Sequence, residues 1–127
     1  MNLAHVGAFT EAMARKDLES MLLHMSEDVV LRTPLVAEPI QGKAAIRPVV
    51  SALLDVVDRF DFQEIMQGPK HVSSFFKVTV GPNQLDGMDY WRLNDSGLIE
   101  EMTVLWRPLP AAVAVQQLLD HGGPKGQ

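Results

Sequence analysis

The chain has 127 residues, of which 46% are hydrophobic and 21% charged, the length and composition of one ordinary globular domain. It contains no cysteine, so disulfides, thiolate metal ligands and cysteine nucleophiles are excluded. The formal net charge of -5, without any cluster of lysine and arginine, argues against a nucleic-acid partner.

The N-terminal half of the chain has the apolar periodicity of three helices. In the first, apolar residues recur at helical spacing over residues 3–13. Asp17 is a suitable N-cap for the second helix. The third follows Gly42 and is the longest, but Pro48 predicts that it either starts later or bends at that point.

Alternating apolar residues predict strands in the rest of the chain. A short strand is expected at residues 29–32, and four longer ones at about 60–66, 72–80, 85–93 and 98–106, joined by turns rich in Gly, Pro, Asn and Asp. A short helix is expected at 109–119. Helices followed by such a meander predict an α+β fold, a cone in which a strongly curved antiparallel sheet wraps over three N-terminal helices and encloses an apolar pocket.

Asp89 lies on the apolar face of its predicted strand. Because side chains alternate along a strand, one face collects Leu85, Asp89, Trp91 and Leu93, and the other collects Asp86, Met88, Tyr90 and Arg92. A buried carboxylate is costly unless it is paired, hydrogen-bonded or neutralised by a raised pKa, and such groups concentrate where a protein handles a ligand. We therefore predict that Asp89 is a candidate catalytic residue in a pocket.

The last strand is the expected hairpin partner of the Asp89 strand, so its inward face should lie beside Asp89. Alternation turns Leu98, Met102, Val104 and Trp106 inward, and Ile99, Glu101, Thr103, Leu105 and Arg107 outward. One ionisable group among apolar and aromatic walls suits an organic molecule with a single polar group. The alternative is that Asp89 bonds a buried backbone amide or a neighbouring side chain, and that the rest is core.

Metal-binding and common catalytic motifs are not indicated. The four histidines lie far apart and have no partner at the spacing of known metal motifs, so neither a metal nor a cofactor is expected. There is no nucleophile elbow, phosphate-binding loop or dinucleotide fingerprint. No apolar run approaches the roughly 20 residues of a membrane span, and no secretory signal is recognisable, so we expect a cytoplasmic protein with no membrane partner.

Several segments together resemble a known family in their order and spacing. They are residues 9–14, 17–19, 24–28, 33–34 and 42–46, then Asp89 and residues 99–108. The chain is similar to the SnoaL-like branch of the nuclear transport factor 2-like superfamily, which includes ketosteroid isomerases, polyketide cyclases and limonene epoxide hydrolase. The resemblance implies one SnoaL-like domain over residues 1–120, a deep apolar pocket, and a homodimer formed through the outer face of the sheet. The glycine-containing residues 121–127 are expected to form a flexible tail.

The resemblance to ketosteroid isomerase also implies what this chain lacks. The oxyanion-hole Asp falls on Asp89, but the Tyr position falls on Phe9 and the general-base Asp on Thr33. Phe9 has no hydroxyl, and Thr33 cannot take a proton from carbon at neutral pH, so that mechanism is not expected here. The epoxide hydrolase pattern requires an Arg where Gly87 stands.

Other positions in the same comparison fall on the walls of the isomerase pocket. Together with strand alternation they give the expected ligand-binding residues, which are Phe9, Thr33, Trp91, Met102, Val104 and Trp106. The expected ligand is a small hydrophobic molecule.

Two functions stay open. The first is a cofactor-independent isomerase, cyclase, hydratase or hydrolase that uses Asp89 as hydrogen-bond donor or proton shuttle. It needs a second polar group, for which the candidates are Thr33, His24, Tyr90 and Arg32. The second is a non-catalytic ligand-binding or dimerisation module, which the missing isomerase base favours. Ile99, Leu105 and Tyr90, on predicted outward faces, suit a dimer interface.

Overall fold

The computed structural model describes residues 2–120. Within them, four helices and six strands follow one another along the chain. The elements are α1 (Ala4–Ala14), α2 (Leu18–Leu23), β1 (Met25–Arg32), β2 (Ile40–Gln41), α3 (Lys43–Val56), β3 (Arg59–Gln67), β4 (His71–Val80), β5 (Asn83–Leu93), β6 (Ile99–Arg107) and α4 (Leu109–Asp120). The tail expected at 121–127 lies outside the described residues.

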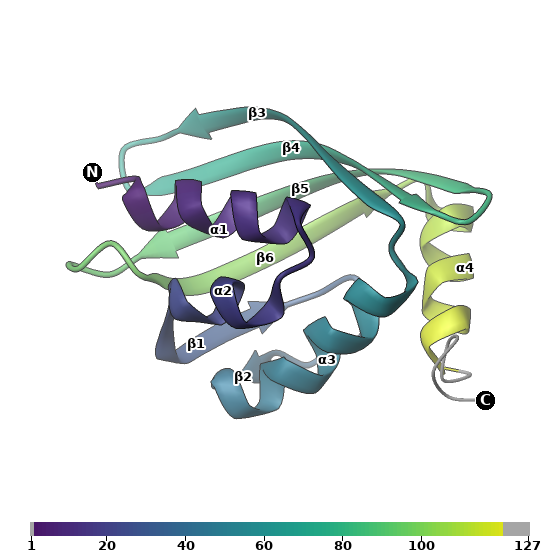
Figure 1. Cartoon of the computed structure of the whole chain (residues 1–127), viewed down its shortest axis with the longest axis horizontal. Coiled ribbons are helices and arrows are strands. Elements are labelled where there is room, and N and C mark those ends of the chain that lie inside the picture. Colours follow the sequence, from purple (N-terminus) through teal and green to yellow (C-terminus); the bar gives the residue numbers. More distant parts are fainter. Residues whose placement is uncertain (1, 121–127) are drawn as a thin grey trace.

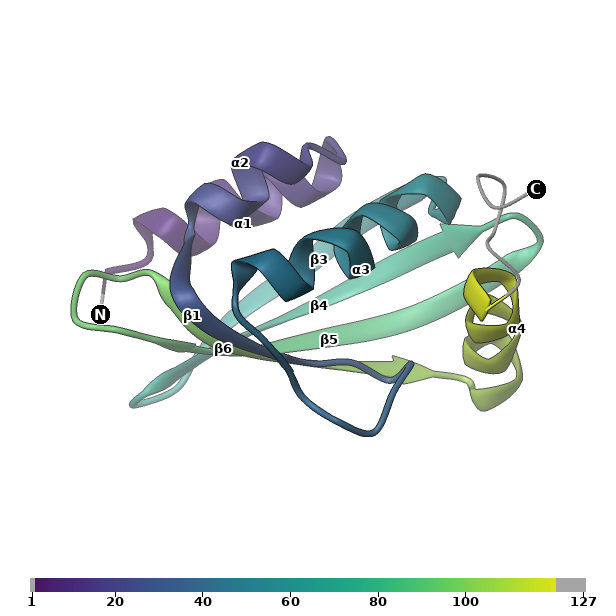
Figure 2. The ribbon, with the colours of Figure 1, turned by 90° about the horizontal axis from the view of Figure 1, so that it is seen from below.

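The strands form one six-stranded sheet in the order β2-β1-β6-β5-β4-β3. Figures 1 and 2 show that the sheet is strongly twisted and curved, that α1, α2 and α3 lie over one face, and that α4 lies at one end. In the same views, no described helix covers the opposite face of the sheet. The predicted α+β fold, a curved sheet over three N-terminal helices, is confirmed.

One pair of strands departs from the predicted antiparallel arrangement. Strands β3 to β6 form the expected antiparallel meander, but β1 pairs with β6 in parallel, with Leu31 opposite Met102. The chain between β1 and β6 contains α3 and the other meander strands, so no hairpin turn fixes the relative direction of the pair. The pairing extends the sheet beyond β6 and gives the cone its second wall.

The helices begin largely where the sequence predicts. Asp17 caps α2, because its carboxylate accepts hydrogen bonds from Ser20 N at 3.2 Å and Ser20 Oγ at 2.6 Å. Helix α3 starts at Lys43 and continues past Pro48, so the later start is excluded. Pro48 and Ala44 are both exposed, so the Ala44 carbonyl group, which loses its helical N–H donor at Pro48, lies on the solvent side of the helix.

The core lies between the helices and the concave face of the sheet. Helix α1 contributes Val6 and Phe9, which are fully buried. Ile99 is fully buried as well, which corrects its predicted outward orientation. The β5–β6 register shifts between Arg92 and Leu93, at the level of Ile99, and such an irregularity breaks the alternation on which the prediction depended.

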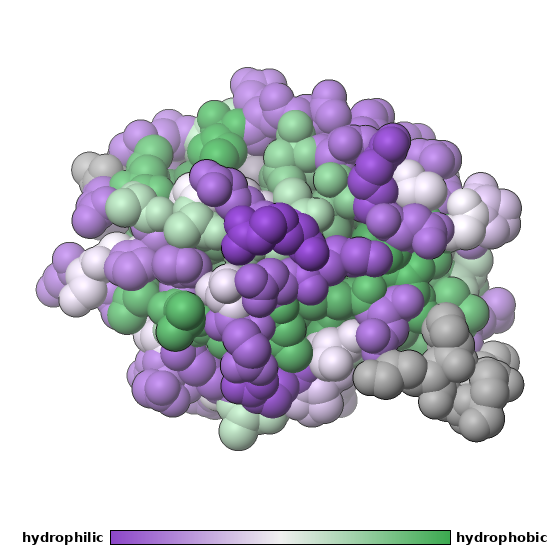
Figure 3. All heavy atoms as spheres, viewed as in Figure 1, coloured by the Kyte–Doolittle hydropathy of each residue, from purple (hydrophilic) through white to green (hydrophobic). Residues whose placement is uncertain are grey.

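On the helical face the exposed surface is mixed, with hydrophilic groups over the helices and apolar atoms showing between them (Figure 3). Apolar atoms gather toward the side of the molecule where α3 ends and α4 lies (Figures 1 and 3). None of the helices within residues 2–120 is long and apolar enough to cross a membrane.

Candidate functional site

Asp89 is buried on the concave face of β5, as strand alternation predicts. Its side chain is 0% exposed, and the neighbouring positions Met88 and Tyr90 face the other way. Its cross-strand partners are Ser74 on β4 and Val104 on β6. The carboxyl group is therefore held at the centre of the sheet, away from both edges.

The Asp89 carboxyl group has no hydrogen-bond partner among the described residues. Both Oδ1 and Oδ2 are buried and unpaired. Burial alone raises the pKa of Asp89 to about 8, because a charged carboxylate is poorly solvated there. At neutral pH the group is thus mainly a neutral acid that can donate one hydrogen bond.

Asp89 opens onto a cavity whose walls are almost wholly apolar. The cavity holds about 50 Å³ of space, and Asp89 is the single ionisable group among its lining residues. These residues are Met13, Met21, Leu31, Thr33, Pro34, Leu35, Val49, Val50, Leu53, Leu54, Phe60, Phe76, Asp89, Met102, Val104 and Trp106. The cavity has room for a few water molecules but is much smaller than the roughly 300–1,000 Å³ of typical ligand pockets.

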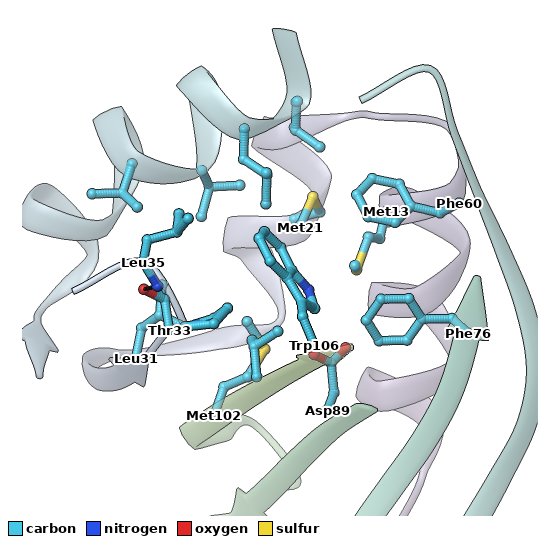
Figure 4. Close-up of a pocket in the computed structure, with 16 residues that line it drawn as sticks. Met13, Met21, Leu31, Thr33, Leu35, Phe60, Phe76, Asp89, Met102 and Trp106 are labelled. Atoms are coloured by element: carbon cyan, nitrogen blue, oxygen red, sulfur yellow. Dashed lines mark hydrogen bonds between the residues drawn. The ribbon is translucent and has the colours of Figure 1, made fainter. Parts of the chain in front are cut away.

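Two aromatic rings flank the acid. In Figure 4 the Asp89 carboxyl group points toward the Trp106 indole and the Phe76 ring, and the indole extends across the cavity toward Met21. Trp106 comes from β6 and Phe76 from β4, so the strands on either side of β5 supply the rings. The Trp106 side chain thus forms one wall of the cavity beside the acid.

The structure brings together most of the residues that the sequence predicts for ligand binding. Thr33, Met102, Val104 and Trp106 all line the cavity with Asp89. Phe9 and Trp91 do not line it, because both are fully buried in the core. Their rings meet edge to face, with centroids 5.9 Å apart and an interplanar angle of 81°, and this contact fastens α1 to the sheet.

The expected second polar group is largely missing from the cavity. Tyr90 stacks on His71 on the outer face, and Arg32 pairs with Glu101 at 3.4 Å, also outside. Thr33 lines the cavity, and its Oγ1 accepts a hydrogen bond from Leu35 N at 3.0 Å.

His24 is likewise engaged elsewhere. Its Nδ1 lies 3.0 Å from Nδ1 of His5, and the two rings form a hydrogen-bonded pair outside the cavity. Partial burial, and then the repulsion of His5, lower the pKa of His24. This pair joins α1 to the start of β1, so a structural role accounts for it.

Two further buried polar atoms near Asp89 also lack partners among the described residues. These are Ser74 Oγ and Trp91 Nε1. Ser74 is opposite Asp89 in the β4–β5 register, and Trp91 is two positions away on the same face. The buried polar atoms without partners are thus neighbours on the concave face of β4 and β5, next to a cavity whose other walls are apolar.

Apart from Thr33, the sequence interpretation missed the part of the cavity wall formed outside the sheet. Pro34 and Leu35 belong to the irregular segment between β1 and β2, and Val49 and Leu53 belong to α3. The apolar stripe of α3 was a usable signal for the latter two. Nothing in the local sequence indicates that the segment after β1 folds over the cavity.

No group of three or more His, Cys, Asp or Glu residues within the described part of the chain could hold a metal ion. What the arrangement offers is a neutral carboxylic acid that donates a hydrogen bond into an apolar space, where such a bond is stronger than in water.

The α+β cone with a buried acid on its concave floor has the architecture of the nuclear transport factor 2-like folds. The model of the SnoaL-like domain matches residues 6–102, so the chain belongs to the SnoaL-like family of the nuclear transport factor 2-like superfamily. No curated protein matches the chain.

Solved structures share the fold over nearly the whole chain. An uncharacterised protein with a cystatin-like fold from Silicibacter pomeroyi is 24% identical, with a TM-score of 0.87 over 94% of this chain and 84% of the other. A steroid delta-isomerase from Pseudomonas aeruginosa is 24% identical, with a TM-score of 0.85 over 94% and 88%. A de novo designed protein with a curved β-sheet is 18% identical, with a TM-score of 0.75 over 94% and 98%. At these identities the likeness shows the fold alone.

Proposed function

We propose that this SnoaL-like protein binds a small, neutral, hydrophobic molecule whose oxygen accepts a hydrogen bond from Asp89. The observation that carries the proposal is the buried, unpaired carboxyl group pointing into an apolar cavity. Leaving a polar group unsatisfied in such a place costs about 1–3 kcal/mol, and a ligand with a carbonyl or hydroxyl oxygen would recover it. An anionic ligand is disfavoured, because its charge would be buried without a cation among the lining residues.

Binding is supported over turnover as the proposed function. An isomerase, cyclase or hydratase reaction would use the protonated Asp89 to stabilise a developing oxyanion. Such a reaction also needs a group that moves a proton, and Thr33, the hydroxyl candidate that lines the cavity, is a poor base. The Pseudomonas aeruginosa steroid delta-isomerase shares the fold, but the positions matched to its class in this chain are Phe9 and Thr33, which lack the required groups.

The test compares the binding of methyl propyl ketone to the wild type and to two variants of Asp89, followed by tryptophan fluorescence and calorimetry. Asp89→Asn keeps a hydrogen-bond donor and should bind the ketone with similar affinity, whereas Asp89→Leu should bind about tenfold more weakly. Wild-type affinity should fall as the pH rises above about 8, where the acid ionises, and Asp89→Asn should lack this dependence. Equal binding by all three proteins at every pH would refute the proposal.

We also propose that the chain forms a homodimer through the outer face of the sheet. Phe75, Met88 and Leu105 are opposite one another on β4, β5 and β6, and this register gives a continuous apolar row on that face. Leu105 is 61% exposed and the nearby Tyr90 49% exposed, so both side chains present apolar area to a partner on this face. A second copy packed against this row would cover them.

A further inference from the structure

A second apolar compartment lies next to the Asp89 cavity. It holds about 190 Å³, nearly four times the volume of the cavity, and is bounded by α3, α4 and the segment between β1 and β2. Its apolar lining residues include Val36, Ile40, Ala52 and Leu119. Val36 is 52% exposed, so this surface is open to solvent in the unliganded protein.

Only a thin wall separates the two spaces. Thr33, Leu35 and Val49 line both, so each of these side chains has the cavity on one side and the second compartment on the other. Thr33 and Leu35 belong to a segment without regular secondary structure. A small displacement of that segment would therefore join the two spaces.

One hydrogen bond ties this wall to the C-terminal helix. Gln116 Nε2 of α4 donates to the Leu35 carbonyl oxygen at 2.7 Å, across 81 positions of sequence. Gln116 itself lines the second compartment. A side-chain hydrogen bond of this kind makes only a small net contribution to stability, which one or two buried methylene groups of a ligand would offset.

We propose that the ligand of Asp89 is elongated, with its oxygen at Asp89 and an apolar chain that passes the Leu35 wall into the second compartment. This inference rests on the proposed function and specifies its substrate class as neutral ketones or alcohols with an unbranched apolar chain. The Asp89 cavity alone is too small for such a molecule, and the adjoining compartment supplies the missing space. Asp120 lies at the second compartment, so a chain that ends in an anion is disfavoured.

The test uses methyl propyl, methyl hexyl and methyl nonyl ketone as probes. If the chain extends into the second compartment, affinity should rise by about fourfold for each added methylene group until the compartment is filled. Ala52→Gln places a polar side chain in the second compartment at an exposed helix position and should remove this gain for the two longer ketones only. Ala45→Gln, an exposed position on the same helix that lines neither space, is the matched control and should bind all three as the wild type does.

A third variant tests whether the hydrogen bond at Leu35 keeps the Asp89 cavity and the second compartment apart. Gln116→Leu removes the bond to Leu35 and should strengthen the binding of methyl nonyl ketone severalfold more than that of methyl propyl ketone. In the wild type, backbone amide NMR signals of Ala52 and Leu119 should shift with the longest ketone and stay unchanged with the shortest.

The outcomes separate this inference from the proposed function. If methyl propyl ketone binds in an Asp89-dependent way but affinity does not rise with chain length, the elongated ligand is refuted and the proposed function stands. If Ala52→Gln weakens all three ketones equally, the second compartment is not the site of the chain. If no ketone binds, the proposed function fails and this inference fails with it.

Discussion

Gly87 of β5 lies directly opposite Phe76 of β4, and a Cβ atom at Gly87 would stand 2.4 Å from Cε2 of Phe76. Real Cβ atoms essentially never come that close, so the Phe76 ring occupies the space that the glycine leaves. The ring then lies beside Asp89 and closes one side of the cavity (Figure 4). The missing side chain at position 87 is thus what allows an aromatic wall next to the acid.

We predict that Gly87→Ala lowers the free energy of unfolding by about 1–3 kcal/mol, because the added methyl group forces Phe76 out of its place. Denaturant unfolding measures the change. Gly7→Ala is the matched control, since Gly7 lies within α1 and a Cβ there meets nothing within 4 Å. That substitution should raise the free energy of unfolding by up to about 1 kcal/mol. A Gly87→Ala protein as stable as the wild type would contradict this account of the Phe76 wall.

Asp89 should make the stability of the protein depend on pH. Its pKa is about 8 in the folded state and 3.8 in the reference state, so between these values the folded protein binds more protons than the unfolded chain. The contribution of the neutral acid is fully present below about pH 4 and is lost progressively as the pH rises to about 8. The slope from this one group is at most about 1.4 kcal/mol per pH unit.

The measurement is the free energy of unfolding of wild type and Asp89→Asn from pH 4 to pH 9, at intervals of about one unit. Because the variant cannot ionise at this position, the difference between the two curves isolates Asp89 from the other titrating groups. We expect the difference to favour the variant increasingly as the pH rises, and to level off above about 8. Parallel curves would mean that Asp89 titrates alike in both states.

Leu105→Glu should turn the proposed dimer into a monomer. The substitution places a charge in the apolar row on the outer face of the sheet, opposite Met88, where burial against a second copy would leave the charge without a partner. Light scattering after size exclusion gives the mass of each form. Leu23→Glu is the control, because Leu23 is 69% exposed at the end of α2, on the helical side. A wild type that stays monomeric at high concentration would rule the interface out.

Strand alternation was sufficient to place Asp89. An acidic residue two positions from Trp91, within a run of alternating apolar residues, has to share the buried face if the strand is regular, and β5 is regular up to Arg92. The same rule predicts that Met102, Val104 and Trp106 face inward, and all three line the cavity. The rule was wrong at Ile99, because the β5–β6 register shifts there. Such a shift depends on how the two strands pair, and the alternation within one strand does not indicate it.

Alternation also cannot distinguish a residue that lines a cavity from one that lies beneath a helix. Trp91 is on the inward face exactly two positions beyond Asp89, yet Phe9 of α1 packs against it and excludes it from the cavity. Which inward side chains stay uncovered depends on where the helices lie. The hydrogen bond from Gln116 to the Leu35 carbonyl oxygen joins residues 81 positions apart, whereas sequence patterns indicate only which residues within a short segment share a face.

The parallel pairing of β1 with β6 has a consequence for how this chain folds as it is synthesised. Residues of β1 leave the ribosome long before those of β6, so β1 can pair early with β2 but cannot form its hydrogen bonds to β6 until the last strand has been synthesised. Until then the helices before it have an incomplete surface to cover, and the meander has an open edge. Completion of the sheet is therefore a late, long-range event, the kind that slows folding and exposes strand edges in the meantime.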